Sequence, residues 1–213
     1  MKVSKTDGGY LVDGRKLSSV TTILHNTLPN NELNGWKSRN SNHKEISRKA
    51  ALLGSLMHLR ILNQLSMAPL EIDKYLPFDE WPPDADKRME ARENQFLNLG
   101  LEFKKPLLIE QIVYHLNDPG YAGTLDICGK IEQRTTIADL KSTRKPIESH
   151  ELQIAAYAAA IESMGMVKRV DWGMVIYVRE DSAEITELNR HELLSRRDEF
   201  MQLAEQYNNR EKS

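Results

Sequence analysis

The stretch GTLDICGKIEQRTTIADLKST, residues 123–143, decides the fold of this chain. Two segments rich in β-branched residues, 121–131 and 134–142, flank a turn-like break at Glu132-Gln133, which predicts two antiparallel strands. A similar segment, 106–116, precedes them. Together the three segments predict an antiparallel meander.

Outside the meander, the pattern alternates between helix and strand. An alanine-rich helix is expected over 148–164, two strands over 171–181 and 182–189, and a charged closing helix over 190–209. The fold class is therefore α+β, with one helix inserted between the third and fourth strands.

The first hundred residues are expected to be mainly helical. Residues 9–17 predict a short hairpin that turns at Asp13-Gly14, and Ser18 and Ser19 are natural N-caps for the short helix that follows. Further helices are expected over 32–40, 43–65 and 84–100, the first two separated from the short helix by a Pro29-Asn30-Asn31 break. In the helix over 43–65, the expected apolar stripe consists of Ile46, Ala50, Leu53, Met57 and Ile61. The helix over 84–100 is expected to be charged and exposed.

The composition favours one large globular domain, because 40% of the 213 residues are apolar and 28% are charged. No apolar run approaches the roughly 20 residues that cross a bilayer, so we expect no membrane partner and a cytoplasmic location. Cys128 is the only cysteine, which excludes an internal disulfide and a four-cysteine iron–sulfur cluster. The net charge of −2 gives no overall sign of nucleic-acid binding.

The predicted strands bring two acids and a lysine to one patch. Residues two apart in a strand share a face, so Asp139 and Lys141 are neighbours, and Asp126 is expected opposite them. Close carboxylates usually share a cation, and hard oxygen ligands favour Mg²⁺ or Mn²⁺. Such an ion would acidify a water that Lys141 orients, which suits phosphodiester hydrolysis. The alternative is a surface ion pair, which a lone D-x-K commonly is.

Two helical features extend this patch. Gln153 and Tyr157 are four residues apart, hence on one helical face, where an amide and a phenol could hold a base or a phosphate. His58 interrupts the apolar segment GSLMHLRIL and could serve as an imidazole ligand, while Gly54, one turn earlier, would leave room for metal or DNA. The alternatives are a solvated glutamine, a tyrosine at the core edge and a satisfied core histidine.

The residues named so far, taken in order, resemble the PD-(D/E)XK nuclease superfamily. The resemblance is greatest to its RecB-like branch, which includes stand-alone phage exonucleases and the mitochondrial genome maintenance exonuclease. It extends from SSVTTIL to about Tyr177 and rests on His58 in GSLMH, Asp126 in GYAGTLD, Asp139 and Lys141 in IADLK, and Gln153 and Tyr157 in QIAAY.

The resemblance implies a restriction-endonuclease-like core in a single nuclease domain, 1–213. Residues 105–190 would form the catalytic sheet core and 191–213 the C-terminal helix. Residues 1–104 would form a mainly helical wall or arch that carries His58. A bacterium or a phage-infected host cell would be the setting.

The resemblance also implies a role for each residue. His58, Asp126 and Asp139 would bind the divalent metal together with the backbone carbonyl of Leu140, and Lys141 would be catalytic. Gln153 and Tyr157 match the Q-x-x-x-Y motif that positions DNA and shapes the site. Glu110 matches an acidic position often seen in the first strand and is a candidate auxiliary ligand or a simple surface residue.

DNA contacts are expected from basic and hydroxyl side chains near the site. Residues 36–49 combine a tryptophan with basic residues, which suits an electrostatic and stacking surface, although a solvated helical face explains them equally well. Ser19 and Thr21 begin a helix whose N-terminus could receive a phosphate, and plain capping is the alternative. The candidates are Ser19, Thr21, Trp36, Lys37, Arg39, Arg48, Lys49, Ser142, Thr143, Arg144 and Lys145.

The function expected is that of a Mg²⁺- or Mn²⁺-dependent DNA exonuclease in replication, recombination or repair, acting on single-stranded or duplex ends. A single-strand-binding protein is a candidate partner. No G-x-x-x-x-G-K-[ST] phosphate loop occurs, so no nucleotide cofactor is expected. Two alternatives stay open: a structure-specific or restriction-type endonuclease on the same fold, and a non-catalytic DNA-binding module.

Overall fold

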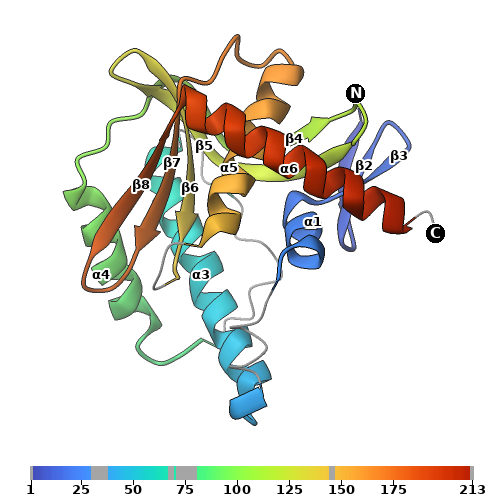
Figure 1. Cartoon of the computed structure of the whole chain (residues 1–213). Coiled ribbons are helices and arrows are strands. Elements are labelled where there is room, and N and C mark those ends of the chain that lie inside the picture. The colour runs from blue at the N-terminus through green and yellow to red at the C-terminus, as the bar shows by residue number, and fades with distance from the viewer. Residues whose placement is uncertain (1, 30–37, 67–69, 71–80, 144–146, 212–213) are drawn as a thin grey trace.

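The structure is a computed structural model, and it describes residues 2–29, 38–66, 70, 81–143 and 147–211. Its main element is a five-stranded sheet in the order β4-β5-β6-β7-β8 (Figure 1). The predicted antiparallel meander and the two later strands are confirmed. The strands are β4 (Lys104–His115), β5 (Tyr121–Ile131), β6 (Arg134–Lys141), β7 (Trp172–Val178) and β8 (Ala183–Asn189).

Local sequence explains two connections of the sheet. Glu132 and Gln133 both have positive φ, 47° and 72°, so they close the β5–β6 hairpin with a turn that matches the twist of its strands. The strands β6 and β7 run parallel, because α5 (Glu148–Ser163) carries the chain back along the sheet between them. The mixed arrangement agrees with the expected α+β class.

One face of the sheet is covered by α5, α6 (Arg190–Glu211) and α1 (Val20–Thr27). In Figure 1, α6 crosses in front of α5 and ends beside α1. The core on this face includes Leu125, Ile137 and Val175 from the sheet, all fully buried. Alanines of α5 let this helix lie close to the strands, which brings its polar side chains near the end of β6.

The opposite face is covered by α3 (His43–Leu65) and α4 (Ala85–Asn98). The expectation that α4 is simply exposed is wrong, because Met89 and Phe96 are 1% and 3% exposed and pack toward the sheet. This helix is mostly charged, but it also carries a narrow stripe of apolar residues at helical spacing. Trp81, just before α4, packs against the same core.

The helix α3 has the predicted bounds, but only its second half is a core helix. Leu53, Met57 and Ile61 are buried, whereas Ile46 is 40% exposed and Ala50 is also exposed, so the predicted stripe does not cover the whole helix. The first half extends beyond the sheet, downward in Figure 1, where none of the described strands lies against it. The expected helix over 32–40 falls mostly on residues 30–37, which lie outside the described residues.

A small second sheet packs on the second half of β4 and the start of β5. It consists of β1 (Val3–Thr6), β2 (Gly9–Val12) and β3 (Arg15–Ser18), in that order. The predicted turn at Asp13-Gly14 is confirmed, and β1 is an additional strand that the hairpin prediction did not include.

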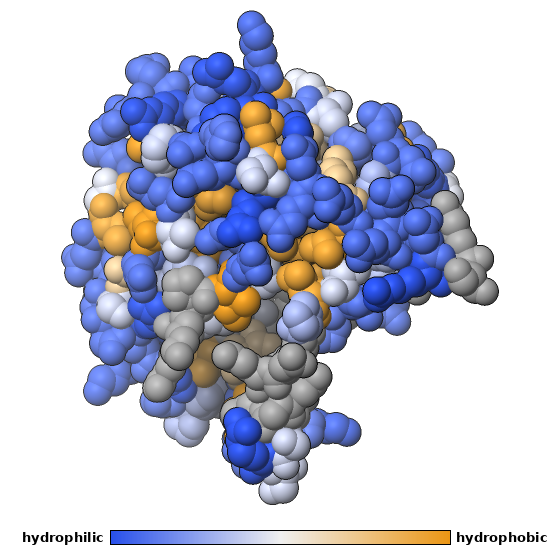
Figure 2. Space-filling model, viewed as in Figure 1, coloured by the Kyte–Doolittle hydropathy of each residue, from blue (hydrophilic) through white to orange (hydrophobic). Residues whose placement is uncertain are grey.

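The molecular surface is largely hydrophilic on the side shown in Figure 2, with apolar side chains in small groups between charged ones. Within the described part of the chain, no helix is long and apolar enough to span a membrane.

Candidate metal and catalytic site

The site begins where β5 and β6 separate. Their ladder ends at the pair Ile127↔Ala138, while β6 continues beside β7 as far as Lys141↔Tyr177. Asp126 and Asp139 are the next residues beyond the last pair of the ladder, one on each strand. The sheet therefore brings both buried carboxylates to the point where the strands part.

The gap between the strands leaves backbone groups for other partners. The Leu140 amide donates to Asp126 Oδ2 at 2.7 Å instead of to a strand. In an extended strand the N–H and C=O of one residue point the same way, so the Leu140 carbonyl also faces the gap. This orientation makes that carbonyl available as a ligand.

Glu110 lies opposite Asp126 on β4, on the rung between Ile109↔Ile127 and Gln111↔Leu125. The alternation of faces breaks there: Ile127 packs under α3 and α4, but Leu125, two residues away, packs under α5. Glu110 itself has a φ of +50°, which is unusual for a non-glycine residue in a strand. The irregular rung points both carboxylates toward α3.

His58 completes this group from α3. One ligand atom from each of His58, Glu110 and Asp126 lies within 4.8 Å of the other two, and His58 Nδ1 is 3.3 Å from Asp126 Oδ2. Burial is the largest influence on His58 and would lower its pKa, but the charge and hydrogen bond of Asp126 together with the Asp139 charge outweigh it, so the net pKa is raised. Burial would raise the pKa of Asp126, and the His58 charge and other partners reverse that shift. Each group therefore favours the charged form of the other.

Asp139 anchors the second half of the site. Its Oδ2 lies 2.6 Å from Lys141 Nζ, and its Oδ1 accepts a hydrogen bond from Gln153 Nε2 at 3.1 Å. Desolvation by burial raises the pKa of Asp139 to about 6, although Lys141 opposes the rise. A divalent cation at this carboxylate would relieve the cost of its buried charge.

Gln153 connects the catalytic candidates. Its Oε1 accepts from Lys141 Nζ at 3.1 Å, and its Nε2 also donates to Tyr157 Oη at 3.1 Å. Both Gln153 and Tyr157 are buried, which removes the interpretation of Gln153 as a solvated residue. A Cβ on Gly123 would lie 2.3 Å from the Tyr157 ring, so β5 needs a glycine at that place.

Gly54 lies close to the residue that follows β6. A Cβ there would lie 3.2 Å from Ser142 Oγ, so the glycine makes room for Ser142. Ser142 is half-buried by this packing, and Thr143 beside it is exposed.

The predicted DNA-binding residues are spread more widely. Ser19 caps α1 by accepting the Thr22 amide at 2.9 Å and bonds the Thr21 and Thr22 hydroxyls, so its hydroxyl is engaged within the helix start. Lys49 pairs with Glu45 at 2.8 Å, and Arg39 and Arg48 are exposed. Four further candidates lie outside the described residues: Trp36, Lys37, Arg144 and Lys145.

Two buried residues beside Lys141 were not singled out from the sequence. Tyr177 is in register with Lys141 on the neighbouring strand, and its hydroxyl lies 3.1 Å from His150 Nδ1. Desolvation, followed by the Lys141 charge, lowers the pKa of His150 to about 4, so this imidazole is neutral. A signal existed, because His150 precedes Gln153 by three residues and shares its helical face.

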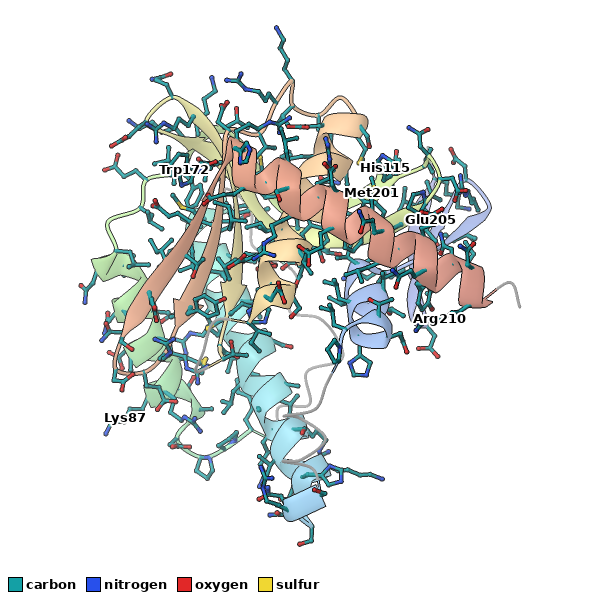
Figure 3. All side chains as sticks on the ribbon, in the orientation of Figure 1. Lys87, His115, Trp172, Met201, Glu205 and Arg210 are labelled. Carbon is teal, nitrogen blue, oxygen red and sulfur yellow. The ribbon has the colours of Figure 1, made fainter. Side chains whose placement is uncertain are left out.

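The site lies at one end of the sheet. Trp172, labelled in Figure 3, begins β7 at the opposite end, where it pairs with Thr136 near the start of β6. An open pocket of about 530 Å³ lies at that far end, lined in part by Arg134, Arg169 and Trp172. It is separate from the metal candidates.

Comparisons with known proteins assign no family to this chain. No family model matches it, and no curated protein matches it. Among solved structures, the crystal structure of SSO0001 has a TM-score of 0.35 and 14% identity, covering 71% of this chain and 73% of that one. This likeness is too low to carry an argument about function.

Proposed function

We propose that the protein is a divalent-metal-dependent deoxyribonuclease that hydrolyses phosphodiester bonds, acting as an exonuclease on DNA ends. The observation that carries the proposal is the separation of β5 from β6, which gathers Asp126 and Asp139 beside Lys141. The same arrangement supports a restriction-endonuclease-like core of the PD-(D/E)XK type.

The donor set fits Mg²⁺ or Mn²⁺. His58, Glu110 and Asp126 offer one nitrogen and two carboxylate oxygens within 4.8 Å of one another, and Asp139 and the Leu140 carbonyl border the same gap. Hard oxygen donors predominate, as these ions prefer. When bound there, the ion would supply Lewis acidity and a water of lowered pKa.

Lys141 has the position expected of a catalytic cation. Asp139 and Gln153 hold its ammonium from two sides, at 2.6 and 3.1 Å, so its place is set before any substrate arrives. A fixed positive charge in a partly desolvated site stabilises the negative charge that develops on phosphate oxygens. Gln153 keeps the carboxylate and the ammonium in one arrangement, and the Tyr157 hydroxyl fixes the Gln153 amide.

The form of the molecule around the site supports action at ends. The helix α3 supplies His58 and continues beyond the sheet, where it carries exposed basic residues such as Lys44 and Arg48. A wall of this kind beside a nuclease centre would favour a single strand or a frayed end over continuous duplex. A role in DNA replication, recombination or repair follows from such a substrate.

The test is cleavage of end-labelled single strands, linear duplex and closed circular DNA, with Mn²⁺ or with chelator. We expect loss of label from linear DNA only, and only with metal. Asp139→Asn and Lys141→Ala should each lower the rate at least about a hundredfold. The matched controls are Asp181→Asn, at an exposed site, and Lys130→Ala, at a half-buried site on β5.

Each other outcome has a clear meaning. Cutting of closed circles would identify an endonuclease, and metal-independent binding without any cutting would identify a DNA-binding module. Wild-type rates in Asp139→Asn or Lys141→Ala, with metal present, would contradict the proposed site.

A further inference from the structure

The N-terminal sheet packs on the same face of β4 and β5 as α3 does. Ile112 and Ala122 lie under the small sheet, while Ile109 and Ile127 lie under α3 and α4. The irregular rung of Glu110 and Asp126 separates these two pairs along the strands. The candidate metal ligands therefore lie in the seam between the two elements that cover this face of the strands, with α3 on one side and the small sheet on the other.

Cross-strand register shows which side chains of the small sheet face the seam. Directly paired residues share a face. Lys5 pairs with Tyr10, which is buried against β5 and whose Oη is 2.9 Å from Thr124 Oγ1. Lys5 consequently lies on the face that packs toward β5, whereas Lys16 pairs with the exposed Leu11 on the outer face.

The direction along β5 places Lys5 at the end nearest the site. On the face of the small sheet that packs toward β5, the cross-strand row of residues that contains Arg15 lies over the loop between β4 and β5. There Arg15 donates a hydrogen bond to the Leu116 carbonyl. The next row contains Lys5 and Tyr10 and lies over Thr124. Continuing in the same direction, Asp126 is two residues beyond Thr124, beside the rung that holds Glu110.

Lys5 is exposed, and its positive charge interacts with the Glu110 carboxylate. The turn after β1 is also held in place, because Thr22 Oγ1 donates to the Gly8 carbonyl at 3.2 Å. The ammonium of Lys5, on a strand held in place beside the candidate metal ligands, is suited to bind an anionic ligand.

We infer that Lys5 binds a backbone phosphate of the DNA strand, adjacent to the phosphate at the metal candidates, and that the N-terminal sheet forms the substrate wall opposite α3. The inference rests on the proposed function, since it assigns a further contact of the same substrate. A lysine contact with phosphate adds affinity without reading sequence.

The experiment measures binding instead of cleavage. Fluorescence anisotropy follows a labelled single-stranded oligonucleotide over a range of NaCl concentrations, with every variant made in the Asp139→Asn background. Losing one phosphate contact lowers the slope of log affinity against log salt by about 0.7 for single strands. We expect this change in Lys5→Gln, with affinity about three- to tenfold lower at low salt.

Controls separate a direct contact from a loss of structure. Lys16→Gln, on the outer face of the same sheet, should keep the parent slope, and Lys5→Arg should restore it. Equal slopes in Lys5→Gln and Lys16→Gln would overturn the inference. Failure of the proposed function can be distinguished from failure of this inference. It would appear as a lack of metal-dependent cleavage by the wild-type protein, whatever the salt dependence of binding in the variants.

Discussion

The ring of Tyr157 packs directly over the backbone of Gly123, so closely that a Cβ on residue 123 would lie 2.3 Å from its Cε1 atom. This contact joins α5 to β5 beside the candidate site. Because the Tyr157 hydroxyl accepts from Gln153, and Gln153 binds both Asp139 and Lys141, the position of the ring affects the whole polar network.

Gly123→Ala is therefore expected to displace the Tyr157 ring. Overpacking of this kind typically destabilises a protein by about 1–3 kcal/mol, and metal-dependent cleavage should fall as well. Urea unfolding and the cleavage assay measure the two effects. In a Tyr157→Ala background the same glycine substitution should cost much less, as a double-mutant cycle would show. An equal cost in both backgrounds would mean that the ring is not the reason.

Glu110 is expected to combine an unfavourable backbone conformation with a role as a metal ligand. Its φ of +50° suits glycine, so Glu110→Gly should be about 1 kcal/mol more stable than Glu110→Ala. Both variants should bind Mn²⁺ at least about tenfold more weakly, because a carboxylate is lost. Thermal unfolding without metal and calorimetric Mn²⁺ titration measure these quantities.

The neighbouring position provides the control for Glu110. Gln111 pairs regularly with Leu125, so there the order should reverse, with Gln111→Ala more stable than Gln111→Gly by about 0.5–1 kcal/mol. If glycine and alanine ranked alike at both positions, backbone strain at residue 110 would have no energetic consequence.

Metal binding is expected to release protons at acidic pH. Burial raises the pKa of Asp139 to about 6, so below that pH an incoming cation must displace the carboxyl proton. The apparent Mn²⁺ affinity should then fall by up to about tenfold per pH unit for each proton displaced. His58 adds to this release, since its pKa is also raised.

Calorimetry in two buffers of different ionisation enthalpy counts the protons released. More should be released at about pH 5.5 than at about pH 7.5. A count that does not change between these conditions would mean that Asp139 is already ionised in the metal-free protein.

His150 is expected to make the fold acid-sensitive. Its pKa is lowered to about 4, mainly by burial, whereas in the unfolded chain it titrates near about 6.5. The unfolded state thus binds the proton more tightly, so stability present above about pH 6.5 is lost as pH falls toward 4. The loss is up to about 3 kcal/mol.

The substitution His150→Gln should flatten this acid limb, because glutamine does not ionise and can still bond to Tyr177. Urea unfolding across this pH range provides the measurement, with His191→Gln at an exposed site as the control. An acid limb as steep as that of the wild type would assign the sensitivity to other groups.

Much of the secondary structure follows from local sequence. The bounds of α3 and of the β5–β6 hairpin were predictable, because helical periodicity and a turn of two residues are local signals. The prediction that α4 is exposed was wrong because charged residues dominate its composition. Burial of Met89 and Phe96 depends on a sheet whose strands come later in the chain. The additional strand β1 contains only one apolar residue, Val3, so it has no apolar alternation to detect.

The candidate site was predictable as a set of residue types and a strand register. Asp139 and Lys141 come together because side chains alternate along a strand, and Gln153 and Tyr157 share a face because helices repeat. These are properties of the backbone that sequence spacing expresses directly.

Only the tertiary structure decided what surrounds those residues. It separates β5 from β6, breaks the alternation at Glu110, buries Gln153, and brings His150, Tyr177 and Lys5 to the site from other elements. These relationships depend on how the helices and the two sheets pack against one another. Packing joins residues that are distant along the chain, so spacing within any one segment could not specify it.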